Sequence, residues 1–155
     1  MNRIEVIRQL VDDILRQQQD KEESRCGFVH LYGVSAICSL LALKRGLNSE
    51  LCTIAGTLHD IWSYKTGNHI DHARLSSIEA KRIMKEVGYF SAEEITTICN
   101  AISNHSDKKS INDLYDEVLK DADVLQHYLY NTTFPVEEHE KERLNKVLKE
   151  LDKQS

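Results

Sequence analysis

Histidine and aspartate are concentrated between residues 55 and 72, in the stretch AGTLHDIWSYKTGNHIDH, which holds three histidines and two aspartates. His59 and Asp60 stand side by side where an apolar run ends. Buried imidazole and carboxylate groups are costly without partners, and one divalent metal ion satisfies several of them at once. The stretch therefore predicts a metal site. The simpler alternative is a capped helix end followed by a polar loop.

Further histidines occupy comparable positions on predicted helices. His30 lies four residues before Val34, on the apolar face of its helix and in its first turn. His105 follows Ile102 by three residues and closes an apolar stripe, whereas His72 opens a helix. One histidine on an apolar face is usually a core residue bonded to a carbonyl. Several of them at helix ends, together with acidic residues, favour one shared site.

Apolar residues recur at helical spacing along the whole chain, and no alternating β pattern runs for long. The spacing predicts one all-α bundle of six or seven helices spanning residues 1–155, with a polar loop after Asp60 that extends through Gly67. A capping box of Ser91 and Glu94 opens the fifth helix. The apolar positions, helix by helix, are Ile7, Leu10, Val11, Ile14; Val34, Ile37, Cys38, Leu41; Leu51, Ile54, Ala55, Leu58; Ala80, Ile83, Met84, Val87; Ile95, Ile98, Cys99, Ile102; Leu114, Val118, Leu125, Leu129; and Val136, Leu144, Val147, Leu148, Leu151.

Composition narrows the classes of partner. Charged residues make up 29% of the chain, the net charge is −5, and no basic block is present, so long nucleic acid is an unexpected partner. The N-terminus has no signal-peptide core, and no run approaches the ~20 apolar residues of a membrane span. We expect a cytoplasmic protein that does not contact membranes. The cysteines form no CxxC pair, so Cys38, Cys52 and Cys99 are expected to be buried thiols.

Three stretches, FVHLYGVSAICSLLA, IAGTLHDIW and LKDADVLQHY, follow one another in the order H…HD…D. Over residues 25–130 the sequence resembles the HD-domain metal-dependent phosphohydrolases, which are named for the adjacent His-Asp pair. The resemblance implies that His30, His59, Asp60 and Asp123 are metal ligands. His72 and His105 resemble the two additional histidines of subgroups that hold two metals.

The choice of aspartate in the last motif stays open at this point. Helical periodicity places Asp121 on the apolar stripe and Asp123 nearly opposite, whereas the A-D-x-L setting of the family motif favours Asp123. We take Asp123 as the ligand, because a central helix can be buried on more than one side. Asp121 would then support the site from behind.

The resemblance implies hydrolysis of a phosphate ester or anhydride, in a nucleotide or a related small molecule, through a metal-activated water. Asp60 and Asp123 would orient or deprotonate that water. One or two ions of manganese, iron, nickel or zinc suit the mixed ligands, with magnesium as a further option. The cations expected to bind substrate phosphate lie beside proposed ligands in the sequence: Lys65, Arg74 and Lys108.

Two other classes of function compete with the hydrolase. Some HD-fold proteins use two irons to activate oxygen, and a non-catalytic binding module would keep the metal only for folding. His69, His127 and His139 have no support as ligands from the pattern. An exposed apolar face on the first or last helix would allow a homodimer.

Overall fold

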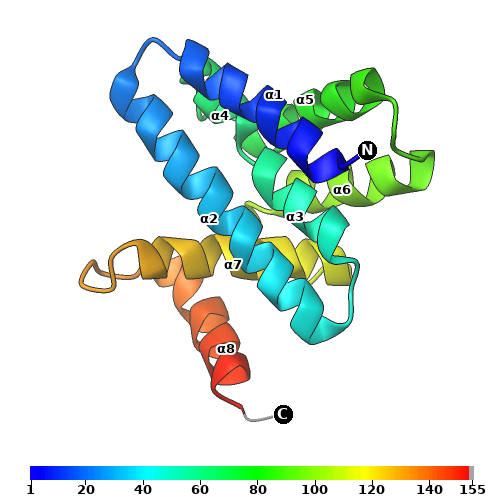
Figure 1. Cartoon of the computed structure of the whole chain (residues 1–155). Helices are drawn as coiled ribbons and strands as arrows, with labels where there is room; N and C mark the ends of the chain where they lie inside the picture. The colour runs from blue at the N-terminus through cyan, green and yellow to red at the C-terminus, as the bar shows by residue number, and fades with distance from the viewer. Residues whose placement is uncertain (154–155) are drawn as a thin grey trace.

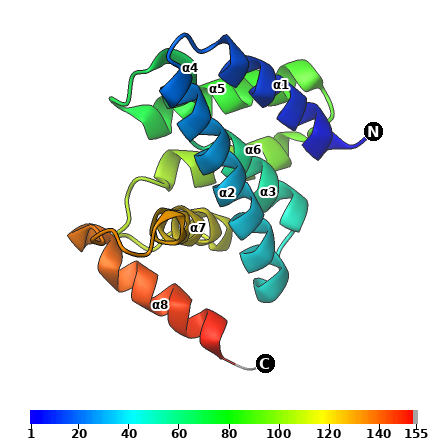
Figure 2. The ribbon, with the colours of Figure 1, turned by 60° about the vertical axis from the view of Figure 1, so that its left-hand side comes forward.

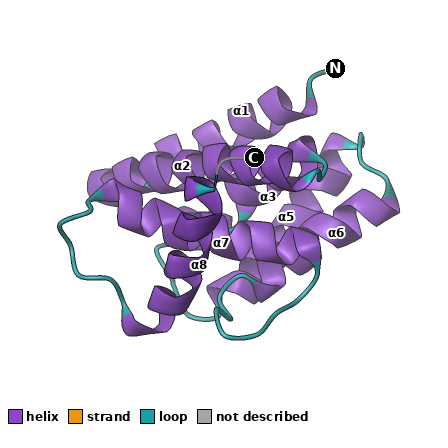
Figure 3. Cartoon of the chain, turned by 90° about the horizontal axis from the view of Figure 1, so that it is seen from below, coloured by secondary structure: helices purple, strands orange, loops and turns teal. Residues whose placement is uncertain are grey.

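The computed structural model describes residues 1–153, and these residues form helices and loops without a strand (Figure 3). The all-α prediction is therefore confirmed. The helices are α1 (Arg3–Gln17), α2 (Lys21–Arg45), α3 (Ser49–Leu58), α4 (Ile61–Thr66), α5 (His72–Val87), α6 (Ala92–Asn104), α7 (Leu114–Tyr130) and α8 (Lys141–Asp152), with the 3₁₀ helix η1 (Glu138–Glu140) before α8.

Local signals in the sequence explain where several helices begin and end. Asp20 caps α2 by accepting hydrogen bonds from the amides of Glu22 and Glu23, and α2 ends at Gly46, whose φ of 69° is left-handed. The capping box that was predicted for Ser91 and Glu94 is confirmed at the start of α6. Because α2 begins at Lys21, its first turn lies well before His30, which corrects the expected position of that histidine.

The central helix of the bundle is α2. Figure 1 shows it crossing the middle of the molecule, with α7 passing behind it, and its main packing partners are α3 and α7. In the turned view of Figure 2, α8 lies on the opposite side of α7 from α1 and α5. The core between these helices is apolar, and Ile7, Leu31, Ile54, Ile98 and Leu119 are among its fully buried side chains.

The composition of helix α2 corrects the expectation that no stretch of the chain is apolar enough to span a membrane. An 18-residue window of this 25-residue helix has a mean hydropathy of 1.8, so by length and composition alone α2 is apolar enough to cross a membrane. The sequence expectation that no run approaches a span overlooked this window. In the structure the apolar residues of α2 pack on α3 and α7, and buried helices in the core of soluble proteins have the same composition.

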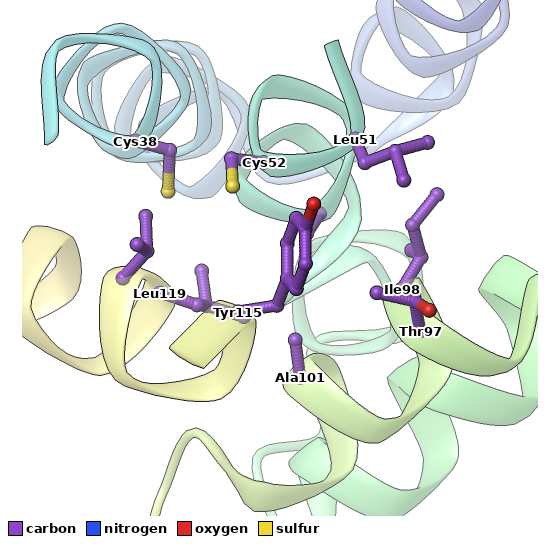
Figure 4. Close-up of a pocket in the computed structure, with 10 residues that line it drawn as sticks. Cys38, Leu51, Cys52, Thr97, Ile98, Ala101, Tyr115 and Leu119 are labelled. Carbon is purple, nitrogen blue, oxygen red and sulfur yellow. The ribbon is translucent and has the colours of Figure 1, made fainter. Parts of the chain in front are cut away.

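One narrow crevice in the core carries none of the predicted chemistry. It lies between α2, α3, α6 and α7, and the thiols of Cys38 and Cys52 and the ring of Tyr115 line it (Figure 4). It has no room for a water-sized molecule. Cys38 and Cys52 are buried free thiols, as expected, whereas Cys99 is only half-buried.

Candidate metal centre

Four side chains from three parts of the chain converge on one point in the interior. His30 Nε2 of α2 lies 3.1 Å from His59 Nε2 and 3.3 Å from Asp60 Oδ2. Asp123 Oδ1 of α7 is 3.2 Å from His30 Nε2 and 3.5 Å from His59 Nε2, and His59 Nε2 is 3.2 Å from Asp60 Oδ2. We call these four residues the inner group.

A second set of donors meets the other oxygen of the same aspartate. Asp60 Oδ1 lies 3.1 Å from His105 Nε2 and 3.4 Å from His72 Nε2. His72 and His105 form the outer group, and Asp60 stands between the two groups with one oxygen toward each. All six residues that the family motif indicated are therefore brought together.

Helix ends deliver most of these side chains. α3 ends at Leu58, His59 is its C-cap, and α4 begins at Ile61, so Asp60 sits at the break between two helices. His105 is the C-cap of α6, and His72 is the first residue of α5. The six-residue α4 occupies the segment that the sequence indicated as a polar loop. The prediction was wrong there because one and a half turns are too short to show helical periodicity.

The imidazoles of both groups are held in one orientation. Nδ1 of His30 lies 2.7 Å from Gln126 Oε1, and Nδ1 of His59 lies 2.7 Å from the carbonyl oxygen of Gly56. Nδ1 of His105 lies 2.7 Å from the oxygen of Ile102, and Nδ1 of His72 is 3.1 Å from that of His69. A neutral imidazole that donates from Nδ1 has a bare lone pair on Nε2. The Nε2 atoms of all four therefore lie toward the cluster, as in histidines that bind metals, and Nε2 of His72 also lies 3.1 Å from Ser106 Oγ.

These distances fit the shell of a metal ion. Donors that lie about 2.1 Å from one ion stand about 3.0 Å apart in octahedral and about 3.4 Å apart in tetrahedral geometry. The five pairs of the inner group that include a histidine span 3.1 to 3.5 Å. Asp60 Oδ1 and Asp123 Oδ1 are buried without a hydrogen-bond partner among the described residues. A cation between the donors would relieve the repulsion between the facing lone pairs and give the two unpaired oxygens a partner.

The electrostatics of the cluster also favour a cation. Burial lowers the pKa of His30, but contacts with Asp123 and Asp60 outweigh burial and raise it to about 10. Burial also lowers the pKa of His59, but the same two carboxylates outweigh it and raise the pKa to about 9. Burial raises the pKa of Asp60, yet the neighbouring imidazoles hold it well below its usual range. The carboxylates thus stay ionised, and their negative charge favours either protons on the neighbouring imidazoles or a metal ion between the donors.

Asp123, and not Asp121, faces the cluster. α7 is buried on several sides, which removes the objection from helical periodicity, and Asp123 is 4% exposed. Asp121 instead pairs with Arg45 at 2.6 Å and with Arg143 at 2.9 Å. Asp121 therefore supports the site only indirectly, through Arg143, which also donates to the carbonyl oxygen of Lys108.

The three cations expected to bind substrate have other partners. Lys108 is buried, and its Nζ contacts Asp123 Oδ2 at 2.6 Å and the oxygen of His105 at 2.5 Å. Lys65 pairs with Glu79 at 2.7 Å, and the exposed Arg74 pairs with Asp71 at 2.6 Å. Lys108 is thus part of the support for Asp123. Within residues 1–153, Lys65 and Arg74 form no hydrogen bond or ion pair with the cluster, so their roles in substrate binding stay predictions.

Two further residues contact the cluster: Gln126, which the sequence did not single out, and His127, which the pattern did not support as a ligand. Gln126 orients His30, as described above, and His127 Nε2 lies 3.5 Å from Asp123 Oδ1. Both follow Asp123 by three or four residues, so both share its side of α7. That spacing was visible in the sequence, but it has meaning only once Asp123 is known to face the site.

A pocket of about 300 Å³ opens over the inner group. His30 and Asp60 form part of its floor, and the other residues around it come mainly from α2 and α7: Arg25, Cys26, Val29, Tyr64, Gln126, His127 and Tyr130. A small molecule in this pocket would lie directly against the carboxylate that the two groups share.

Comparison with known proteins agrees with this geometry. A model of the HD domain matches residues 27–128, about two-thirds of the chain, including the H…HD…D order. The chain belongs to the HD-domain family. HD domains bind divalent metals, and the family is one of metal-dependent hydrolases, so the resemblance seen in the sequence is confirmed.

A solved structure shares the fold. The crystal structure of a predicted HD superfamily hydrolase from an uncultured Thermotogales bacterium superposes with a TM-score of 0.61 and 22% sequence identity, covering 92% of this chain and 88% of that one. The HD fold of this protein therefore extends beyond the matched core to nearly the whole chain.

Proposed function

We propose that this HD protein is a metal-dependent phosphohydrolase that acts on a phosphate ester or anhydride of a nucleotide or a related small molecule. The observation that carries the proposal is the position of Asp60, which lies between two groups of imidazoles at the floor of a 300 Å³ pocket. His30, His59, Asp60 and Asp123 would hold one divalent ion, and Asp60, His72 and His105 a second. Bound there, such ions polarise phosphoryl oxygens and lower the pKa of water.

Asp123 is suited to orienting the attacking water. Burial raises the pKa of Asp123, but the charge of Lys108 and the neighbouring histidines hold it well below its usual range. A carboxylate with so low a pKa takes up a proton poorly, so it is better suited to orienting a water than to deprotonating it. We therefore assign Asp123 to positioning, and its contact with Lys108 fixes the direction of its free oxygen.

The pocket walls are compatible with a nucleotide. Tyr64 and Tyr130 offer aromatic faces on which a base can stack, and Arg25 brings a guanidinium to the rim. Arg25 now pairs with Glu22, an exposed partner on the same helix that a phosphate group could replace. These features support a small anionic substrate with an aromatic part.

The proposal is tested first by metal analysis. Protein purified without chelator is compared with Asp60→Asn and with Asp71→Asn, an exposed aspartate beside His72 that provides a matched control. We expect manganese, iron, nickel or zinc at one to two ions per chain in the wild type and the control, and a loss of at least half in Asp60→Asn. Equal metal content in all three proteins would contradict the site.

Activity is then tested with the loaded protein on nucleoside mono-, di- and triphosphates and on p-nitrophenyl phosphate, by release of inorganic phosphate. We expect Asp60→Asn to reduce turnover at least about 100-fold while circular dichroism stays unchanged. Two bound irons with oxygen uptake and no phosphate release would instead favour the oxygenase. Bound metal without either reaction would favour the binding module.

A further inference from the structure

His127 shares the side of α7 that faces the cluster. It follows Asp123 by four residues, which is about one helical turn, so the two side chains project in nearly the same direction. The ring lies on the wall of the pocket whose floor holds His30 and Asp60. Its side chain is 46% exposed, so it meets both the pocket and the buried Asp123.

Nδ1 of His127, the ring nitrogen on the side away from Asp123, contacts a carboxylate. Nδ1 lies 3.0 Å from Oε1 of Glu140, a buried residue at the end of η1. This repeats the arrangement of the other cluster histidines, each of which has an oxygen at Nδ1. The contact leaves Nε2 of His127 as the nitrogen with the free lone pair.

That nitrogen lies close to the cluster. Nε2 is 3.5 Å from Asp123 Oδ1, a buried oxygen that has no hydrogen-bond partner within residues 1–153. The ring is nearly parallel to that of His30, at 12° with centroids 5.1 Å apart. One donor atom each from His30, Asp123 and His127 lie within 4.8 Å of one another. Small shifts of these side chains would bring all three donor atoms into contact with one ion.

From these contacts we propose that His127 is a fifth histidine ligand, which binds the ion of the inner group from the pocket side. The proposal rests on the metal centre of the proposed function and adds a donor to it. Glu140 has the positioning role, since it holds the ring of His127 in place. The C-terminal part of the chain thereby takes part in metal binding.

A purely structural role accounts for less of the geometry. A salt bridge between His127 and Glu140 would anchor η1 to α7 without any approach of Nε2 to a carboxylate of the cluster. The ring could then turn its free edge to the solvent in the pocket. Instead, Nε2 lies 3.5 Å from Oδ1 of Asp123, whereas Lys108 contacts the other oxygen, Oδ2.

The inference is tested with the cobalt(II) form of the full-length protein. In a paramagnetic cobalt protein, the ring N–H of each bound histidine gives its own strongly shifted, exchangeable proton signal. The test variant is His127→Phe, which keeps a flat ring beside His30 and removes both nitrogens. The matched control is His139→Phe, since His139 is exposed and lies 4.0 Å from the same Glu140 oxygen.

We expect His127→Phe to lack one shifted signal that the wild type and the control show. Its affinity for cobalt, measured by competition with a chelator, should be lower by at least about tenfold. Glu140→Gln keeps an acceptor for Nδ1 without the charge, so it should retain every signal, shift the one that His127→Phe loses, and weaken binding less.

Three other outcomes would overturn either the role of His127 or the proposed function. If His127→Phe binds cobalt and keeps every shifted signal of the wild type, His127 is not a ligand, whatever happens to the affinity, and the metal centre still stands. If His127→Phe does not fold, Glu140→Gln decides, and the absence of any shifted signal that moves overturns the inference. If wild-type protein binds no cobalt, the proposed function itself fails.

Discussion

At the scale of single residues, Lys108 shows how a buried charge supports the site. Its ammonium group lies between Asp123 and the carbonyl oxygen of His105, and its side chain is 4% exposed. Expected from sequence to bind substrate, it instead balances a carboxylate of the inner group. Removing one partner of a buried ion pair leaves the other without compensation.

We therefore predict that Lys108→Met lowers the free energy of unfolding of the metal-free protein by about 3 kcal/mol or more. The loss should be smaller in the metal-loaded protein, because the ion compensates Asp123. Urea unfolding with and without metal measures both values. Lys109→Met, at an exposed neighbour, is the control, and equal losses in both metal states would contradict the role of Lys108.

The sequence predicted the donors of the cluster better than their surroundings. His30, His59 and Asp60 have residue types and a motif order that imply metal chemistry directly. The sequence assigned Lys108 to substrate binding and gave His127 no role, because the surroundings of both depend on which way a neighbouring helix faces, and tertiary packing sets that direction. Asp123 was recovered only by the family motif, since a helix buried on several sides has no single apolar stripe.

At the scale of helices, the close contact between α2 and α3 positions His59. A Cβ added at Gly56 would lie 2.8 Å from Ser35 Cα and 3.0 Å from Cys38 Sγ, so only glycine fits between the two helices. The carbonyl oxygen of Gly56 also accepts the hydrogen bond from His59 Nδ1. One residue therefore sets both the packing of the helices and the direction of a ligand.

Gly56→Ala should accordingly reduce the free energy of unfolding by about 1–3 kcal/mol through overpacking. Metal affinity should fall as well, because a shift of α3 moves the carbonyl that orients His59. Urea unfolding of the metal-free protein and a chelator competition measure the two effects. Wild-type stability in Gly56→Ala would contradict the steric argument.

A second contact between helices depends on pH. Arg3, in the first turn of α1, donates to Glu50 at the start of α3 and to Glu94 at the start of α6. These hydrogen bonds lower the pKa of both carboxylates. The resulting stabilisation is present above the unfolded-state pKa of about 4.5 and is lost as the pH falls through the lower folded-state values.

Arg3→Met should therefore be less stable than the wild type at pH 7, by no more than about 1 kcal/mol for each partly exposed pair. The difference should shrink as the pH falls toward 3, because the wild type then loses the same contacts. Melting temperatures of the metal-free proteins between pH 7 and 3 test this. Arg8→Met, which breaks an exposed pair within α1, is the control, and a constant difference for Arg3→Met would refute the expectation.

At the scale of the whole molecule, the metal centre connects helices that are distant in sequence. Its proposed ligands come from α2, the break after α3, the start of α5, the end of α6, and α7. A ligand that binds only the folded state stabilises it by about 2.7 kcal/mol when present at 100 times its dissociation constant. Metal removal should thus affect the stability of most of the bundle.

We predict that a chelator lowers the melting temperature by about 5–10 °C, as expected for such a free-energy change in a domain of this size. Differential scanning fluorimetry with and without chelator measures the shift, and added metal should reverse it. The Asp60→Asn variant should show a much smaller response. A melting temperature that does not respond to the chelator in the wild type would argue against a bound ion.

The two groups of donors differ in their access to solvent. The side chain of His59 is fully buried and that of Asp123 is 6% exposed, whereas His72 at the outer group is 32% exposed. With two ions bound as proposed, the inner ion would meet solvent through the pocket over His30 and Asp60, whereas the outer ion would lie beside the partly exposed His72. A substrate that fills this pocket would then slow the exchange of the inner ion with the surroundings and leave the outer ion accessible. Bound substrate would therefore protect one of the two metals from a chelator.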